Sequence, residues 1–79
     1  MDRPIIKLSE VGKNISAIVH DVVGCADFKL RLQELGFTPG CEIMLMSETL
    51  FGGPLSFRVR DAKIALRRQD ADLVMVQPA

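Results

Sequence analysis

The sequence lacks tryptophan and tyrosine altogether, and its four phenylalanines bring the aromatic content to only 5 %. Domains that bind proline-rich peptides line their groove with several aromatic side chains. Because so few rings cannot build such a groove, the composition argues against a receptor for proline-rich peptides.

An excess of one charge is also missing, because ten Lys and Arg balance ten Asp and Glu. Proteins that bind nucleic acid or anionic bilayers through long-range attraction carry a basic surplus or patch. The balance therefore predicts that nucleic acid is not a partner.

No apolar run approaches the roughly 20 residues that span a bilayer. The N-terminal residues MDRPIIKLSE do not show the basic and then apolar pattern of a secretory signal. We therefore expect a cytoplasmic protein that is neither exported nor directly inserted into a membrane.

Histidine and cysteine are scarce, with only His20, Cys25 and Cys41. The two cysteines fit no disulfide framework, so we expect reduced thiols. His20 precedes Asp21, but adjacent strand residues point to opposite faces and make a poor acid–base pair. No spacing prearranges metal ligands, which leaves His20 and Cys25 as weak candidates for a metal site.

A phosphate-binding loop is missing as well, since the turn Gly52-Gly53-Pro54 lacks the lysine and the following helix that such loops need. These gaps predict a protein that is not an enzyme, binds no cofactor and has no specific metal site.

What the sequence does contain is the hydrophobic content of a folded domain, 48 % of 79 residues. A chain of this length buries roughly 60–65 % of its unfolded surface, which is enough for one core. We expect residues 1–79 to form a single domain.

One amphipathic helix is predicted at about residues 27–35. Asp27 suits the N-cap position, and Phe28, Leu32 and Leu35 recur at helical spacing on one face. We expect this face to pack against the core.

Gly36 and Phe37 specify the end of this helix. Glycine suits the left-handed residue on which helices often end, and Phe37 is expected to contact Leu32 in the last turns. Pro39 and Gly40 then match the two central positions of a type II turn. The helix should therefore lead through a tight turn into the next strand.

Short runs of β-prone residues surround the helix, several of them alternating apolar and polar. Five or six short antiparallel strands with one inserted helix are typical of a small, mainly β, partly open barrel. The runs are residues 5–8, 15–23, 41–50, 55–60, 64–66 and 73–76, and the polar residues 67–72 are long enough for one helical turn.

Outward-facing apolar side chains are the best candidates for a binding surface. If Ile43 and Leu45 face the core, then Met44 and Met46 face outward as an adaptable apolar pair. The alternative is that the helix or an N-terminal strand covers both methionines.

Two further pairs complete the predicted partner contacts: Leu50 with Phe51 beside the glycine turn, and Arg58 with Arg60 on one strand face. Phe51 either protrudes as an anchor or covers one end of the barrel. The arginines either bind carboxylates or form a solvated face.

Three motifs follow one another: Leu32-x-x-Leu35-Gly36-Phe37-x-Pro39-Gly40, then Gly52-Gly53-Pro54-Leu55, then Ile64-Ala65-Leu66-Arg67 with Ala71 shortly after. Together, over roughly residues 28–76, they resemble the ferrous iron transport protein A family, FeoA. Taken singly, the glycines are also explained by a helix cap and tight turns.

The resemblance implies an SH3-like barrel that serves bacterial ferrous iron uptake as a small cytosolic accessory or regulatory protein. Its implied partner is the cytosolic part of the ferrous iron permease, which carries a GTPase domain. The alternative is a related module found at the C-terminus of metal-dependent repressors, although the chain has neither a helix-turn-helix segment nor a basic stripe. Exposed strand edges leave open a monomer or a weak homodimer.

Overall fold

The structure, a computed structural model, describes residues 4–78 except for the Leu50 side chain; the predicted domain limits, residues 1 and 79, lie outside this range. Within it, six strands form one antiparallel sheet in the order β1-β6-β2-β3-β4-β5. The strands are β1 (Ile6–Lys7), β2 (Ser16–Val22), β3 (Glu42–Glu48), β4 (Leu55–Val59), β5 (Ala62–Leu66) and β6 (Val74–Pro78), and the helices are α1 (Ala26–Leu35) and α2 (Arg68–Ala71).

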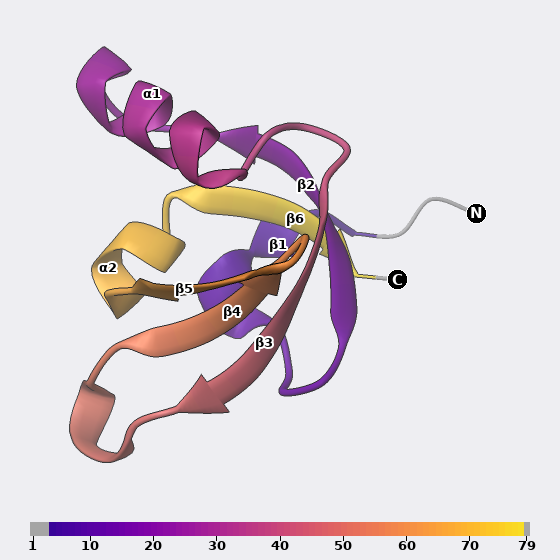
Figure 1. The fold of residues 1–79 in the computed structure, drawn as a ribbon, viewed down its shortest axis with the longest axis vertical. Coiled ribbons are helices and arrows are strands. Elements are labelled where there is room, and N and C mark those ends of the chain that lie inside the picture. Colours follow the sequence, from indigo (N-terminus) through magenta and orange to yellow (C-terminus); the bar gives the residue numbers. More distant parts are fainter. Residues whose placement is uncertain (1–3, 79) are drawn as a thin grey trace.

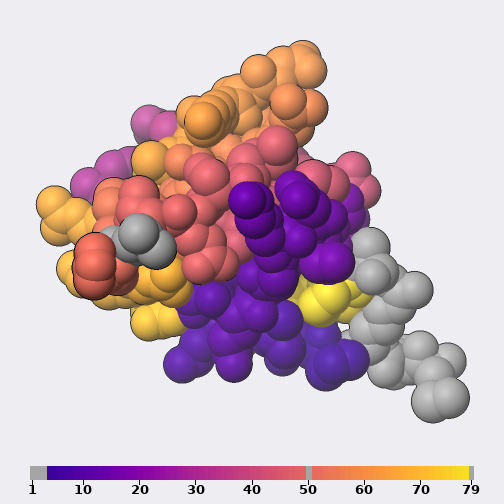
Figure 2. Space-filling view, turned by 90° about the horizontal axis from the view of Figure 1, so that it is seen from below, coloured from indigo at the N-terminus to yellow at the C-terminus, as the bar shows by residue number. Residues whose placement is uncertain are grey.

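The sheet curls around the core, with α1 toward one end of the long axis and the loop between β3 and β4 at the other (Figure 1). Figures 1 and 2 both place the N-terminal segment beside the C-terminal strand, as the pairing of β6 with β1 and β2 requires. Ser9, in the 3₁₀ turn Leu8–Glu10, donates a hydrogen bond to Asp72, just after α2. This contact links the two ends of the sheet order, because α2 follows the edge strand β5.

Alternate residues of β3 and β4 fill the core as predicted. Ile43 and Leu45 of β3 are buried, and so are Leu55, Phe57 and Val59 of β4. Burial of such side chains is the main favourable term in folding, worth roughly 1.5–3 kcal/mol for each. The regular alternation of the two strands therefore separates an apolar inner face from an outer face that remains available for contacts.

The helix differs from prediction at both ends. Cys25, not Asp27, precedes its first residue, and no side chain of the described residues caps the N-terminal end of the helix. Phe28 and Leu32 are buried as expected, but Leu35 is 40 % exposed. The reason is that the chain turns back after Leu35 and inserts Phe37, which is fully buried, where the next turn of the helix would have packed.

The helix ends in the expected manner. Gly36 has a φ of 108°, and its amide donates to the carbonyl of Gln33 while the Phe37 amide donates to that of Leu32. These two bonds are those of a Schellman motif. Phe37 then packs edge to face against Phe57 of β4, with ring centroids 6.4 Å apart. The helix end is thus joined to the sheet.

The turn after the helix is also as expected, because the Cys41 amide donates to the Thr38 carbonyl at 3.0 Å and Gly40 has a φ of 90°. This geometry is typical of a type II turn. The Gly40 amide donates to Val19 of β2 at 2.8 Å. The turn is therefore held against the sheet.

Two irregularities interrupt the predicted alternation. The register of β2 shifts between Val19 and Asp21, so that His20 and Asp21 are both exposed rather than on opposite faces. The register of β3 shifts between Leu45 and Ser47, which leaves Met46 at the irregularity. A bulge places an additional residue in one strand and breaks the two-residue period locally.

Several strand limits also differ from prediction. Only Ile6–Lys7 of the first predicted run is a strand, because Leu8 enters the 3₁₀ turn with its side chain buried. The chain reverses between β4 and β5 at residues 60–61, one position earlier than expected, since Val59 already pairs with Ala62. Strand β5 is correspondingly longer than the predicted 64–66.

The glycine loop and the last motif have clear local roles. Phe51 and Gly52 both have a positive φ, and Thr49 donates to the Pro54 carbonyl across the loop. Leu66 is buried, and the carbonyl of Arg67 accepts bonds from the amides of residues 70 and 71, which begin α2. The residues of these two motifs thus form a loop and the start of α2.

Candidate interaction surface

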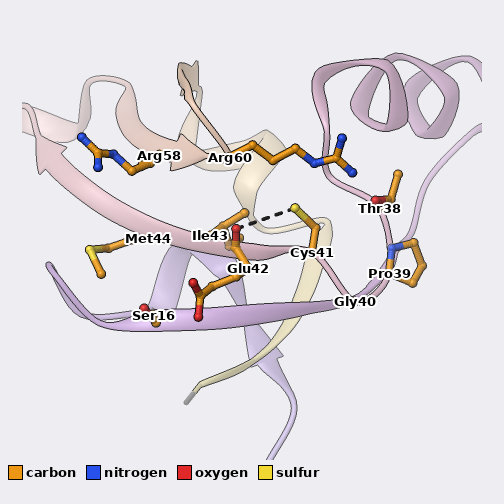
Figure 3. Close-up of a pocket in the computed structure, with 10 residues that line it drawn as sticks. All are labelled: Ser16, Thr38, Pro39, Gly40, Cys41, Glu42, Ile43, Met44, Arg58 and Arg60. Carbon is orange, nitrogen blue, oxygen red and sulfur yellow. Dashed lines mark hydrogen bonds between the residues drawn. The ribbon is translucent and has the colours of Figure 1, made fainter.

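An open groove of about 540 Å³ crosses the outer side of β3, next to the turn that follows α1 (Figure 3). It is built from segments that are far apart in the sequence but adjacent in the sheet. The residues that line it are Ser16, Thr38, Pro39, Gly40, Cys41, Glu42, Ile43, Met44, Arg58 and Arg60. Three of the six predicted partner contacts, Met44, Arg58 and Arg60, are therefore brought together.

Strand register explains why these side chains meet. Met44 lies opposite Ser16 of β2 on one side and opposite Arg58 of β4 on the other. Arg58 in turn lies opposite Lys63 of β5. Directly opposed residues present their side chains on the same face of a sheet. A row of one hydroxyl, one thioether and two cations thus crosses the outer face.

The position of Arg60 in the chain differs from the prediction. It does not share a strand face with Arg58, because it lies in the turn between β4 and β5 with a φ of 56°. Figure 3 shows its side chain extending across the groove toward the turn that holds Thr38. The short hairpin, rather than strand alternation, therefore sets the position of the second guanidinium.

The charges of the groove are unpaired within residues 4–78. There, Arg58, Arg60 and the Glu42 carboxylate make no hydrogen bond or ion pair, whereas Arg68 of α2 pairs with Glu48 of β3 at 3.4 Å. Exposed guanidinium groups without a partner can form bidentate bonds with a carboxylate. The groove therefore contains charged groups that are not paired with other groups of residues 4–78 and can bind a partner.

Met44 and Met46 are half-buried. Met46 lines a neighbouring hollow of about 200 Å³ together with Arg58, Asp61, Ala62 and Lys63. No residue of α1 or β1 lines this hollow or the groove. Met44 and Met46 therefore each border open space, on the groove and on the neighbouring hollow respectively.

Phe51 and Leu50 lie apart from the groove. The Phe51 side chain is fully exposed, at 103 % of its reference area, and does not cover an end of the barrel. The Leu50 side chain lies outside the described part of the structure. A partner contact through either residue stays a prediction.

The groove also contains residues that the sequence interpretation did not single out as contacts: Ser16, Thr38, Cys41 and Glu42. The type II turn predicted after the helix was a usable signal for Thr38 and Cys41, because it places both beside the start of β3. The Cys41 thiol is 3.7 Å from the Glu42 carbonyl and is partly exposed. Its position makes it a useful reporter of groove occupancy.

Potential metal ligands are not gathered anywhere in residues 4–78, where no group of three or more His, Cys, Asp and Glu side chains has the required proximity. His20 and Cys25 are both exposed, near the end of β2 and before α1. No helix in the same range is long and apolar enough to cross a membrane.

Comparison with known proteins agrees with this architecture. The FeoA protein of Stenotrophomonas maltophilia, solved with zinc, is 34 % identical with a TM-score of 0.79, over 91 % of this chain and 89 % of that one. That protein is described as a prokaryotic SH3 domain protein and a candidate activating factor of ferrous iron transport. The six-stranded sheet with its inserted helix is therefore an SH3-like module.

The family is shown by sequence as well. Residues 6–78 match the family described as the FeoA domain, and the chain belongs to this family. A Porphyromonas gingivalis protein described as a fusion of Fe(2+) transport protein A with the Fe(2+) transporter FeoB is 31 % identical over 72 residues, or 91 % of this chain. The chain spans only 8 % of that relative's length.

The predicted alternative also has a structural counterpart. A manganese-dependent transcriptional repressor covers the whole chain with a TM-score of 0.86, but it is 14 % identical and the chain covers 44 % of it. This likeness shows that the fold is shared with metal-dependent repressors, and it shows the fold alone.

Proposed function

We propose that this chain acts as one small cytosolic regulatory domain that contacts the cytosolic part of a ferrous iron permease and catalyses no reaction itself. The observation that carries the proposal is the Porphyromonas gingivalis fusion, in which the matching domain and the transporter form one polypeptide. Domains that are fused in one organism often associate as separate chains in another.

The outer face of β3 supports contact as the mode of action. Its groove combines half-buried Met44 with guanidinium groups that lack an internal partner. Methionine adapts its shape to a partner, and arginine is enriched in interfaces. We infer that this face docks on the permease and biases its assembly or its nucleotide cycle.

The test is binding of the purified chain to the detergent-solubilised full-length permease and to its isolated GTPase domain, with and without guanine nucleotide. We expect saturable binding of the wild type and a loss of at least about tenfold in affinity for Met44→Glu/Met46→Glu, because a buried unpaired charge at an interface is costly.

The matched control is Leu30→Glu/Leu35→Glu, which places the same two charges on exposed leucines of α1. This variant should bind like the wild type. Absence of wild-type binding to either form of the permease, under both nucleotide conditions, would remove the proposed function.

A further inference from the structure

The groove is polarised across its width. Arg58 and Arg60 lie along one side and Glu42 with Ser16 along the other, while Met44 lies between them (Figure 3). An occupant that satisfies the whole groove must offer a negative group to one side and hydrogen-bond donors to the other. It must also offer an apolar group to the thioether.

Simple anions and nucleic acids fit these requirements poorly. Inorganic phosphate can pair with the arginines, but it has no N–H group to donate to the Glu42 carboxylate and no apolar group to pack on Met44. Bases of single-stranded nucleic acids stack on aromatic rings, and no ring is among the residues that line the groove.

An extended protein segment meets all three requirements. It supplies backbone N–H groups, acidic side chains and aliphatic side chains on alternate sides. The volume of about 540 Å³ is also within the range of sites that hold small ligands or a few side chains, roughly 300–1,000 Å³.

We propose that the groove binds an extended acidic segment of a partner protein. A carboxylate of the segment pairs with Arg58 and Arg60, N–H groups donate to Glu42, and an aliphatic side chain packs on Met44. The inference rests on the proposed function in one respect, because the segment is sought in the cytosolic part of the permease.

The experiment is an amide NMR titration of the ¹⁵N-labelled full chain with overlapping short peptides that cover the cytosolic part of the permease. At least one acidic peptide should shift the amides of Ser16, Met44 and Arg58 more than those of α1. The same peptide with its carboxylates replaced by amides should bind about tenfold more weakly. Added salt should lower the affinity of the acidic peptide.

Two charge-reversed variants of the chain distinguish binding at the groove from attraction by the net charge of the whole protein. Arg58→Glu/Arg60→Glu should lose binding of the acidic peptide, whereas Lys13→Glu/Lys29→Glu, with the same change in net charge at exposed sites, should retain it. Unchanged amide spectra away from the substitutions show that both variants are folded. Retained binding in the arginine variant overturns the proposal.

Other outcomes distinguish this inference from the proposed function. If the intact permease binds but no peptide shifts the groove, the inference fails and the proposed function stands. If an acidic peptide binds the groove while the intact permease does not bind, the ligand chemistry stands and the proposed function fails. If inorganic phosphate or anionic phosphatidylserine vesicles shift the groove amides and acidic peptides do not, the occupant is a different anion and the inference is overturned.

Discussion

Met44 of β3 lies directly opposite Arg58 of β4, so that a thioether and a guanidinium share one cross-strand pair on the outer face of the sheet. Their inward-facing neighbours Ile43 and Leu45 are almost fully buried. Adjacent positions of one strand therefore have separate tasks, since one set builds the core and the other remains available to a partner.

This division predicts opposite responses to truncation at neighbouring positions. Ile43→Ala should destabilise the protein by about 2–5 kcal/mol, because it leaves a cavity in the core. Met44→Ala should change stability by less than about 1 kcal/mol, because its side chain is only half-buried. Urea unfolding of both variants measures the difference. Equal losses would show that Met44 belongs to the core.

The glycines that follow α1 should differ in their tolerance of alanine. A Cβ at Gly36 would lie 2.9 Å from Val59 Cγ1, and the residue has a positive φ. We expect Gly36→Ala to cost about 2–4 kcal/mol, from strain and steric overlap.

At Gly40, an added Cβ would meet no atom of the described residues within 4 Å. Gly40→Ala should therefore cost only the backbone strain of about 1–2 kcal/mol. The ranking of the two variants is checked by thermal or urea unfolding. A larger loss at Gly40 than at Gly36 would contradict the packing of the helix end on β4.

Phe51 should be dispensable for folding, although it is aromatic. Its side chain is fully exposed and its φ is 63°, a conformation that asparagine adopts at lower cost. Phe51→Asn should leave stability unchanged or raise it by up to about 1 kcal/mol. Phe57→Ala, in the core, should cost about 3–5 kcal/mol. A clear destabilisation by Phe51→Asn, measured by urea unfolding, would show that the ring packs on the molecule.

The ion pair between Arg68 and Glu48 joins α2 to β3 but should contribute little. Both side chains are substantially exposed, at 39 % and 47 %. Pairs of this kind typically contribute about 0.2–1 kcal/mol and weaken with salt. A double-mutant cycle with Arg68→Ala and Glu48→Ala, measured at low and high salt, gives the coupling energy. A coupling well above 1 kcal/mol that persists at high salt would contradict this expectation.

The sequence was sufficient to predict the helix, its end and most strands, because these depend on local patterns. Gly36 and Gly40 encode their turns through backbone freedom, and the alternation of β4 encodes its buried face. Leu35 was placed wrongly since helical periodicity does not show where the chain turns back to insert Phe37.

The site was predictable only in part. Strand alternation correctly suggested that Met44 and Arg58 face outward, but only the register of β3 with β4 brings them together. Arg60 reached the groove through a turn whose position was predicted one residue too late. The bulge that exposes both His20 and Asp21 has no signal in the residue pattern. Pairings between distant strands are set by the whole core rather than by local sequence.

If the groove side of β3 docks on the permease, the two cysteines should differ in their response to bound permease. Cys41 lines the groove, whereas Cys25 is exposed before α1 and is not among the lining residues. Alkylation rates of both thiols are measured by mass spectrometry with and without saturating permease. We expect bound permease to slow alkylation of Cys41 by about tenfold or more, since interface cores exclude solvent, and to leave Cys25 unchanged. Protection of Cys25 instead, or of neither thiol, would contradict docking through the groove.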